Sequence, residues 1–181
     1  MALLEWIASE AKHPMPFPRW QGAFVLKYGR AFTPRPLPSR MKTGKLHFCF
    51  ENCQRALIKS DLVYCEGYAM QNGAPYPAHH AWLSTRDGFV VDLTWTAKRF
   101  SLKKAAVPLA AEYFGVPFQR MFVLAQYLRT QMCFGLLDGC DEKSLWKTCP
   151  SPDKFLEPLG SLRPQSLVRQ RTNRKRKLRQ E

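Results

Sequence analysis

Residues 49–95 read CFENCQRALIKSDLVYCEGYAMQNGAPYPAHHAWLSTRDGFVVDLTW, and this stretch decides the fold. Its first part, residues 49–59, has apolar side chains at helical spacing, which predicts a helix with one buried face. The remainder predicts three strands joined by short turns, over residues 61–70, 79–85 and 89–94. We therefore expect an α+β fold in which a helix packs on an antiparallel meander, with further helices at its flanks.

Three kinds of reactive side chain stand on these predicted elements, in the order cysteine, histidine, aspartate. Cys49 begins the helix, His79 and His80 share the second strand, and Asp92 lies in the third. A helix N-terminus has unpaired N–H groups and the positive end of the dipole, which favour a thiolate. Cys53 lies one turn further on and lacks this benefit, so we expect it to be a packed core residue. The order suits a thiol nucleophile, its base and the carboxylate that orients the base.

The two adjacent histidines must point to opposite faces of their strand, so only one of them can lie beside Cys49. His80 shares its face with Trp82. Asp92, on the neighbouring strand, is within cross-strand reach of the histidine pair, and its apolar surroundings require a partner such as an imidazole N–H. An oxyanion would be bound by the Cys49 backbone N–H and one further donor. The candidates for that donor are Asn52, Tyr64 and the backbone amides before Cys49.

Two other interpretations of these residues stay open. In the first, Cys49 is an ordinary core cysteine, His80 a capped histidine and Asp92 a turn residue. In the second, one histidine joins three cysteines as soft metal ligands, namely Cys49, Cys53 and Cys65. The spacing of that set fits no common zinc module, so we expect no metal and no cofactor. We expect the six cysteines to be reduced, because the N-terminus lacks a secretory signal.

Five short motifs resemble an uncharacterised bacterial and bacteriophage family of papain-like, transglutaminase-like cysteine hydrolases: CFEN at 49–52, EGY at 66–68, HAW at 80–82, DLTW at 92–95 and YFGV at 113–116. The resemblance covers about residues 45–118 and implies a papain-like core. It implies that Cys49 is the nucleophile, His80 the base and Asp92 the orienting residue.

The implied reaction is acyl chemistry on a peptide or another substrate that bears an amide, ester or thioester. Peptidase, amidase, deamidase and transglutaminase activities all occur on this fold, so the resemblance does not choose among them. Together, the motifs and the strand pattern give four oxyanion or substrate candidates: Asn52, Tyr64, Glu66 and Trp82.

The flanking sequence suggests three segments. Residues 1–44 hold a helix over 2–12 and a proline-rich arm, residues 45–150 form the core, and residues 151–181 form an extension with a basic tail. Gly115 and Pro117 predict a turn over residues 112–118. A helix is predicted over residues 119–132, with one apolar stripe made of Met121, Leu124, Ala125, Leu128 and Met132. Residues 20–30 fit no single pattern.

The net charge of +14 is concentrated outside residues 49–95, and residues 167–181 hold seven basic residues and one Glu. Such a tail predicts salt-sensitive contacts with nucleic acid or another polyanion, although a solvated end explains it too. The tail candidates are Arg169, Arg171, Arg174, Lys175, Arg176, Lys177 and Arg179. The alternative function is thus a non-catalytic basic protein that binds nucleic acid or ribonucleoprotein on a hydrolase-like scaffold.

No apolar run approaches the roughly 18 residues of a membrane span, and the N-terminus has acidic residues and no basic region. A hydrophobic content of 45% is ample for a buried core, which argues against general disorder. We expect no membrane partner and a cytoplasmic location, in the host cytoplasm for a phage-encoded chain.

Overall fold

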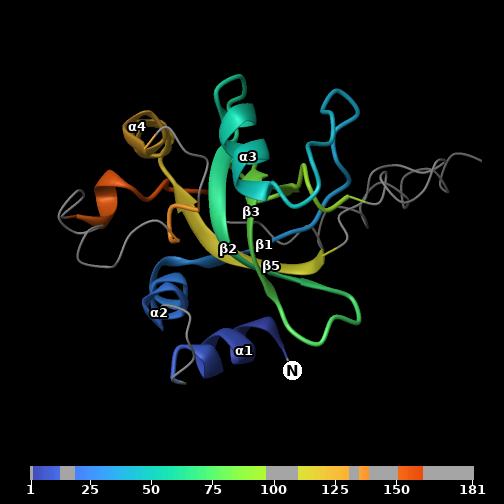
Figure 1. Ribbon diagram of the computed structural model, residues 1–181, viewed down its shortest axis with the longest axis vertical. Coiled ribbons are helices and arrows are strands. Elements are labelled where there is room, and N and C mark those ends of the chain that lie inside the picture. Colours follow the sequence, from blue (N-terminus) through green and yellow to red (C-terminus); the bar gives the residue numbers. More distant parts are fainter. Residues whose placement is uncertain (1, 13–18, 97–109, 131–134, 139–150, 161–181) are drawn as a thin grey trace, which may run out of the picture.

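The computed structural model describes residues 2–12, 19–96, 110–130, 135–138 and 151–160. These residues form a mixed α+β fold built on a curled antiparallel sheet (Figure 1). The elements in chain order are α1 (Leu3–Glu10), α2 (Arg19–Tyr28), β1 (Arg30–Phe32), α3 (Cys49–Leu57), β2 (Val63–Gln71), β3 (Ala78–Ser84), β4 (Val90–Val91), β5 (Ala110–Phe118), α4 (Arg120–Thr130) and a 3-10 turn (Pro152–Lys154).

The sheet has the strand order β1-β5-β2-β3-β4, and every neighbouring pair is antiparallel. The predicted meander is present as β2, β3 and β4. However, β4 covers only two residues, instead of the six expected over 89–94. The strand ends there because the Asp92 carboxylate accepts hydrogen bonds from the backbone N–H groups of Thr94 and Trp95. Such an Asx-type turn takes the chain out of the ladder.

The turn expected over residues 112–118 is wrong, because this segment lies within β5, paired with β2 on one side and β1 on the other. Gly115 sits opposite Gly67, where a Cβ would lie 2.6 Å from the ring of Trp82. Glycine is therefore needed for close packing and not for a turn. The carbonyl oxygen of Pro117 accepts a hydrogen bond from the backbone N–H of Glu157 and not from β2. The nitrogen of Pro117 faces the same side of the strand as this carbonyl, so the proline removes no hydrogen bond between β5 and β2.

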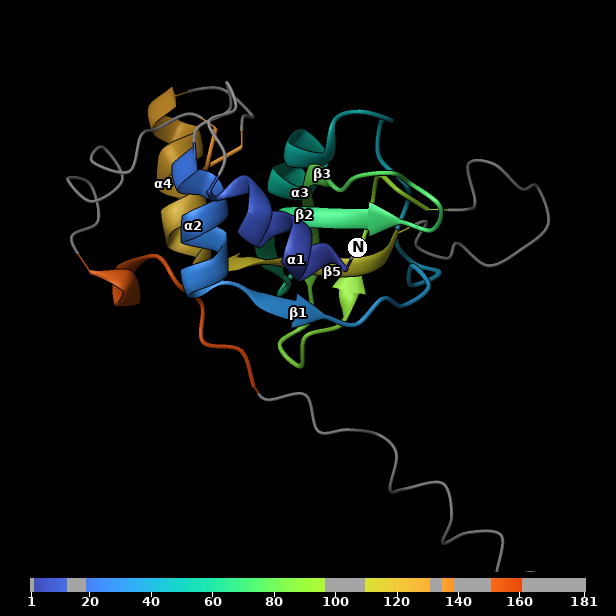
Figure 2. The same ribbon diagram turned by 90° about the horizontal axis from the view of Figure 1, so that it is seen from below.

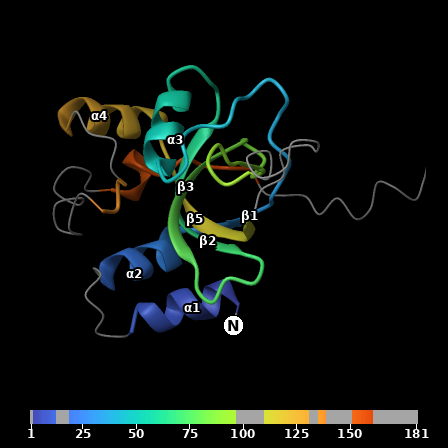
Figure 3. The ribbon, with the colours of Figure 1, turned by 45° about the vertical axis from the view of Figure 1, so that its right-hand side comes forward.

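The two faces of the sheet carry separate apolar clusters. The face that bears Tyr64 and Tyr68 of β2 packs against buried side chains from α1, α2, α3 and α4. The opposite face bears a smaller aromatic cluster, which includes Phe32, Trp82 and Tyr113. Figures 1 and 3 place α3 and α4 towards one end of the molecule and α1 and α2 towards the other. The strand residues are thus buried from both sides.

The N-terminal segment is more than an arm. In α1 and α2 the side chains of Ile7 and Val25 have no exposed surface, and β1 is the outermost strand beside β5 (Figure 2). The sheet therefore includes residues from before position 45. In α4 the predicted stripe is wrong: Phe122 and Val123 are buried, whereas the Met121 side chain is 73% exposed.

No helix among the described residues has both the length and the apolar character that crossing a membrane requires. Several predictions fall outside the described residues. They concern Met132, Cys133, Cys140, Cys149 and the whole basic tail from Arg169 to Arg179.

Replacing Gly115 with alanine is expected to destabilise the fold by about 1–3 kcal/mol, because the added Cβ overlaps the Trp82 ring and the Glu66 carbonyl. Gly22→Ala is the matched control. Gly22 lies within α2, and the added Cβ would make an ordinary 3.6 Å contact with Ala11. This substitution should be neutral or should stabilise the fold by up to about 1 kcal/mol. Urea unfolding of both variants measures the difference. Equal stability of the two variants would contradict the proposed packing.

Candidate functional site

The Asp92 carboxylate is buried and accepts four hydrogen bonds. Oδ1 accepts the backbone N–H groups of Thr94 at 2.7 Å and Trp95 at 2.8 Å. Oδ2 lies 2.9 Å from His80 Nε2 and accepts the Tyr113 hydroxyl at 2.9 Å. Burial alone would raise the pKa of Asp92, but His80 and the backbone donors outweigh it and lower that pKa. The carboxylate is therefore ionised and fixed in position.

The His80 imidazole is held between this carboxylate and the Cys49 thiol. Its side chain is 1% exposed, and the indole of Trp95 stacks on it with 4.2 Å between ring centroids. Burial opposes the charged ring, but Asp92 and a side-chain hydrogen bond with Cys49 raise the pKa of His80 to about 9. With Nε2 bonded to Asp92, Nδ1 is the ring nitrogen that remains for the thiol. At neutral pH the ring is an imidazolium.

Cys49 is the first residue of α3, and its side chain reaches His80 at the edge of β3. β2 pairs with β3 at His80, but β4 pairs only with Leu83 and Ser84, so within the described residues no strand covers the other side of β3 at His80. The helix begins after Phe48, whose side chain makes no capping hydrogen bond, and its first backbone bond joins Asn52 N to Phe48 O at 2.9 Å. Cys49 is 8% exposed. The thiol thus combines a helix N-terminus, an imidazolium and residual contact with solvent.

The other described cysteines lie in a different environment. Cys53 and Cys65 have no exposed surface. Burial raises the pKa of the Cys53 thiol well above its ordinary value, and nearby Asp92 and Cys49 add to the effect. Burial likewise raises the pKa of Cys65. Both therefore remain neutral thiols with little nucleophilic character, and they provide natural controls for Cys49.

Among the oxyanion and substrate candidates, Asn52 ties the loop before α3 to the segment after β4. Its amide nitrogen donates to Lys45 O at 2.7 Å and to Thr94 Oγ1 at 2.8 Å, and its oxygen accepts Lys45 N at 2.9 Å. Both amide protons are therefore already used. Asn52 positions the residues beside Asp92, and the backbone N–H of Cys49 remains as the predicted oxyanion donor.

Tyr64 and Glu66 lie fully buried on the helix-covered face and form a second polar cluster. The Glu66 carboxylate accepts the Tyr64 hydroxyl at 2.9 Å and the backbone N–H groups of Leu136 at 2.7 Å and Leu137 at 2.9 Å. These bonds fasten the 135–138 turn to β2. Neither side chain has exposed surface, and a contact of Tyr64 or Glu66 with substrate stays a prediction.

His79 points to the face opposite His80 and belongs to this second cluster. Its Nε2 lies 3.2 Å from Glu66 Oε1, and its Nδ1 lies 3.2 Å from Asp138 Oδ1. Burial opposes its charge, but the two carboxylates raise its pKa to about 10. His79 is thus a cation that bridges two acidic residues, on the side of β3 away from the Asp92–His80 pair.

Trp82, the last substrate candidate, is fully buried beside His80. Its indole N–H has no hydrogen-bond partner among the residues that the structure describes. The reasoning from sequence missed the contributions of Tyr113 and Trp95, which hold the carboxylate and cover the imidazole. The YFGV motif contains Tyr113 and the DLTW motif contains Trp95, and these motifs were the signal that could have found both residues.

Within the described parts of the chain, no group of three or more His, Cys, Asp or Glu residues is arranged to hold a metal ion. No family model matches the chain, and no match was found among curated proteins or among solved structures.

The charged state of His79 predicts a pH dependence of stability. Because its folded pKa of about 10 exceeds the unfolded value of about 6.5, its contribution is complete below pH 6.5 and is lost as pH rises through 10. The His79→Gln variant should lose less unfolding free energy than the wild type over this range, measured by urea unfolding at each pH. Part of the loss of stability with rising pH should remain in His79→Gln, because the pKa of His80 is also raised, to about 9.

The control is His47→Gln at an exposed histidine, which should keep the wild-type pH dependence. A His79→Gln variant whose stability falls as steeply as that of the wild type would show that the bridge between Glu66 and Asp138 carries no charge.

Proposed function

We propose that the protein is a cysteine-dependent hydrolase or acyl transferase with a papain-like core, in which Cys49 attacks, His80 transfers protons and Asp92 orients His80. One observation carries the proposal: a buried imidazole joins the thiol at the start of α3 to a carboxylate held by four donors. If Asp92 and His80 formed only a structural ion pair, that pair would need no thiol beside it. If Cys49 were only an inert core residue, it would need no charged imidazole beside it.

The proposed reaction begins with the Cys49 thiolate paired to the His80 imidazolium. The sulfur adds to the carbonyl carbon of an amide or ester, and the backbone N–H at the start of α3 stabilises the oxyanion. The C–N or C–O bond then breaks, and His80 gives its proton to the leaving amine or alcohol. The resulting thioester is attacked by water or by an amine, whose proton passes to His80, and Cys49 is released as the thiolate.

The role of Asp92 in this proposal is orientation and charge. Its Oδ2 fixes one imidazole nitrogen, which leaves the other for Cys49, and its negative charge stabilises the imidazolium. Tyr113 and the N–H groups of Thr94 and Trp95 prevent the carboxylate from turning away. The choice between hydrolysis and transfer depends on the acceptor that reaches the thioester.

Replacing Cys49 is the direct test. Iodoacetamide at neutral pH should alkylate Cys49 in the native protein at least about tenfold faster than Cys53 or Cys65, as read by peptide mass spectrometry. Acetylation by p-nitrophenyl acetate should give a thioester on Cys49. Cys49→Ala should lower turnover at least about a thousandfold while the fold is retained. Cys53→Ala is the matched control and should keep its activity. Equal alkylation of the three thiols would overturn the proposal.

The pKa of His80 predicts how the rate depends on pH. For an amide substrate, kcat/KM should fall as pH rises through about 9, because the leaving amine needs the proton of His80. For an activated ester of the same acyl group the fall should be absent, since its leaving group departs without a proton. Asp92→Asn should move the amide limb to lower pH. A common pH profile for both substrates would contradict the role of His80 as proton donor.

A further inference from the structure

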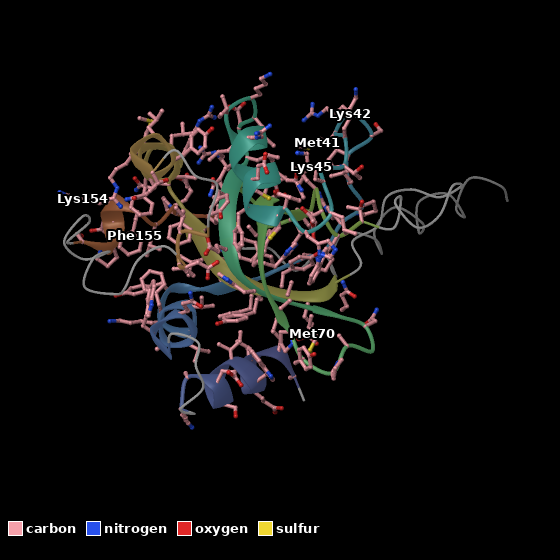
Figure 4. The ribbon with its side chains drawn as sticks, viewed as in Figure 1. Met41, Lys42, Lys45, Met70, Lys154 and Phe155 are labelled. Carbon is pink, nitrogen blue, oxygen red and sulfur yellow. The ribbon has the colours of Figure 1, made fainter. Side chains whose placement is uncertain are left out.

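A basic hollow of about 490 Å³ runs beside α3, on the same helix that presents Cys49. Its charged lining is Lys42, Arg55 and Lys59, and its apolar lining is Ala56, Ile58 and Leu93. The volume lies within the range of roughly 300–1,000 Å³ that is usual for small-ligand sites. Figure 4 shows Lys42 on the loop that rises next to α3.

The charge balance of the hollow is positive. None of its lining residues is acidic, but one of them, Arg55, pairs with the Glu51 carboxylate at 2.7 Å. The negative end of the α3 dipole is also covered. Arg120 donates to the carbonyls of Ile58 at 2.9 Å and Ser60 at 2.7 Å. An anion that enters the hollow therefore meets the cations Lys42 and Lys59, whereas Arg55 is already paired with Glu51 and the carbonyls of Ile58 and Ser60 are already bonded to Arg120.

Two segments of the chain connect the hollow with the proposed site. Asn52 lines the hollow and bonds to Thr94, and Leu93, also in the lining, is the residue after Asp92. Along the axis of α3, Arg55 lies about 9 Å from Cys49 at 1.5 Å per residue, and Lys59 follows the end of the helix at Leu57. An extended peptide advances about 3.3 Å per residue, so the Arg55 level of the hollow lies about three residues from an amide at Cys49, and Lys59 lies further along.

We propose that this hollow binds an acidic side chain of a peptide substrate, a few residues away from the amide that Cys49 attacks. The inference rests on the proposed function and names the substrate class for that site. A carboxylate pairs with Lys42 and Lys59, and the neighbouring apolar side chain packs on Ile58 and Leu93. A nucleic-acid strand fits less well, because the lining offers no aromatic ring for base stacking.

The test measures binding to the full-length Cys49→Ala protein by fluorescence anisotropy at low salt, so that no turnover occurs. The probe is a fluorescein-labelled peptide with a central glutamine and glutamates three and four residues away on both sides. The matched probe has glutamine at those four positions, and a third probe is a ten-nucleotide single-stranded RNA. The acidic peptide should bind at least about tenfold more tightly than its neutral match.

Two charge reversals locate the binding. Lys42→Glu with Lys59→Glu should weaken the acidic peptide at least about fivefold and leave the neutral one unchanged. Arg55 is kept because it pairs with Glu51. The matched control is Lys27→Glu with Lys154→Glu, two exposed lysines outside the hollow; Figure 4 shows Lys154 on the other side of the molecule from Lys42. The control changes the net charge equally, so it removes any general attraction from the comparison.

Equal weakening by both pairs would overturn the inference, because net charge alone would then explain the binding. If Lys42→Glu with Lys59→Glu weakened the binding of the RNA but not that of the acidic peptide, the inference would be overturned in favour of a nucleic-acid site. This result can be distinguished from a failure of the proposed function. If peptide binding depended on the hollow but Cys49 were alkylated no faster than Cys53 and Cys65, the catalytic proposal would be wrong and the binding site would remain.

Discussion

The buried carboxylate of Asp92 is the constraint on which the candidate site depends. A buried charge costs several kcal/mol unless donors surround it, and Asp92 has four of them. Two of these donors bend the chain after β4, one comes from β5, and the fourth is His80. One carboxylate thus ends a strand, joins two parts of the sheet and fixes the imidazole, so changing it would disturb the fold and the site together.

Two neighbouring residues of β3 serve opposite faces of the sheet. His80 meets Asp92 on the face with the aromatic cluster, whereas His79 meets Glu66 and Asp138 on the face covered by helices. The carboxylate partners of each imidazole raise its pKa by stabilising the protonated ring, but of the two only His80 has a thiol beside it. In the proposed function the first pair activates this thiol, whereas the second fastens the 135–138 turn. The two imidazoles are protonated for the same reason, but the groups beside them give them different roles.

The sequence was sufficient for the central part of the fold because the patterns there are local. Helical spacing after Cys49 and alternation in residues 61–70 and 79–85 depend only on near neighbours. Alternation also gave the opposite directions of His79 and His80. β5 was missed because the role of Gly115 depends on Gly67 and Trp82, which are far away in the chain. Which face of α4 is exposed likewise depends on the residues that pack against the helix, and the apolar pattern within the helix does not predict those contacts.

The same distinction explains why the nucleophile and the residues around it were unequally predictable. Cys49, His80 and Asp92 are rare reactive types on recognisable elements, so their order alone suggested a relation. Tyr113 and Trp95 are common core residues whose contribution lies in one hydrogen bond and one ring contact. Those contacts exist only because β5 crosses next to β2 and because the chain turns at Asp92. The sequence is sufficient to propose which residues take part, whereas only the folded chain supplies the donors and rings that hold the His80 imidazole and the Asp92 carboxylate in one orientation.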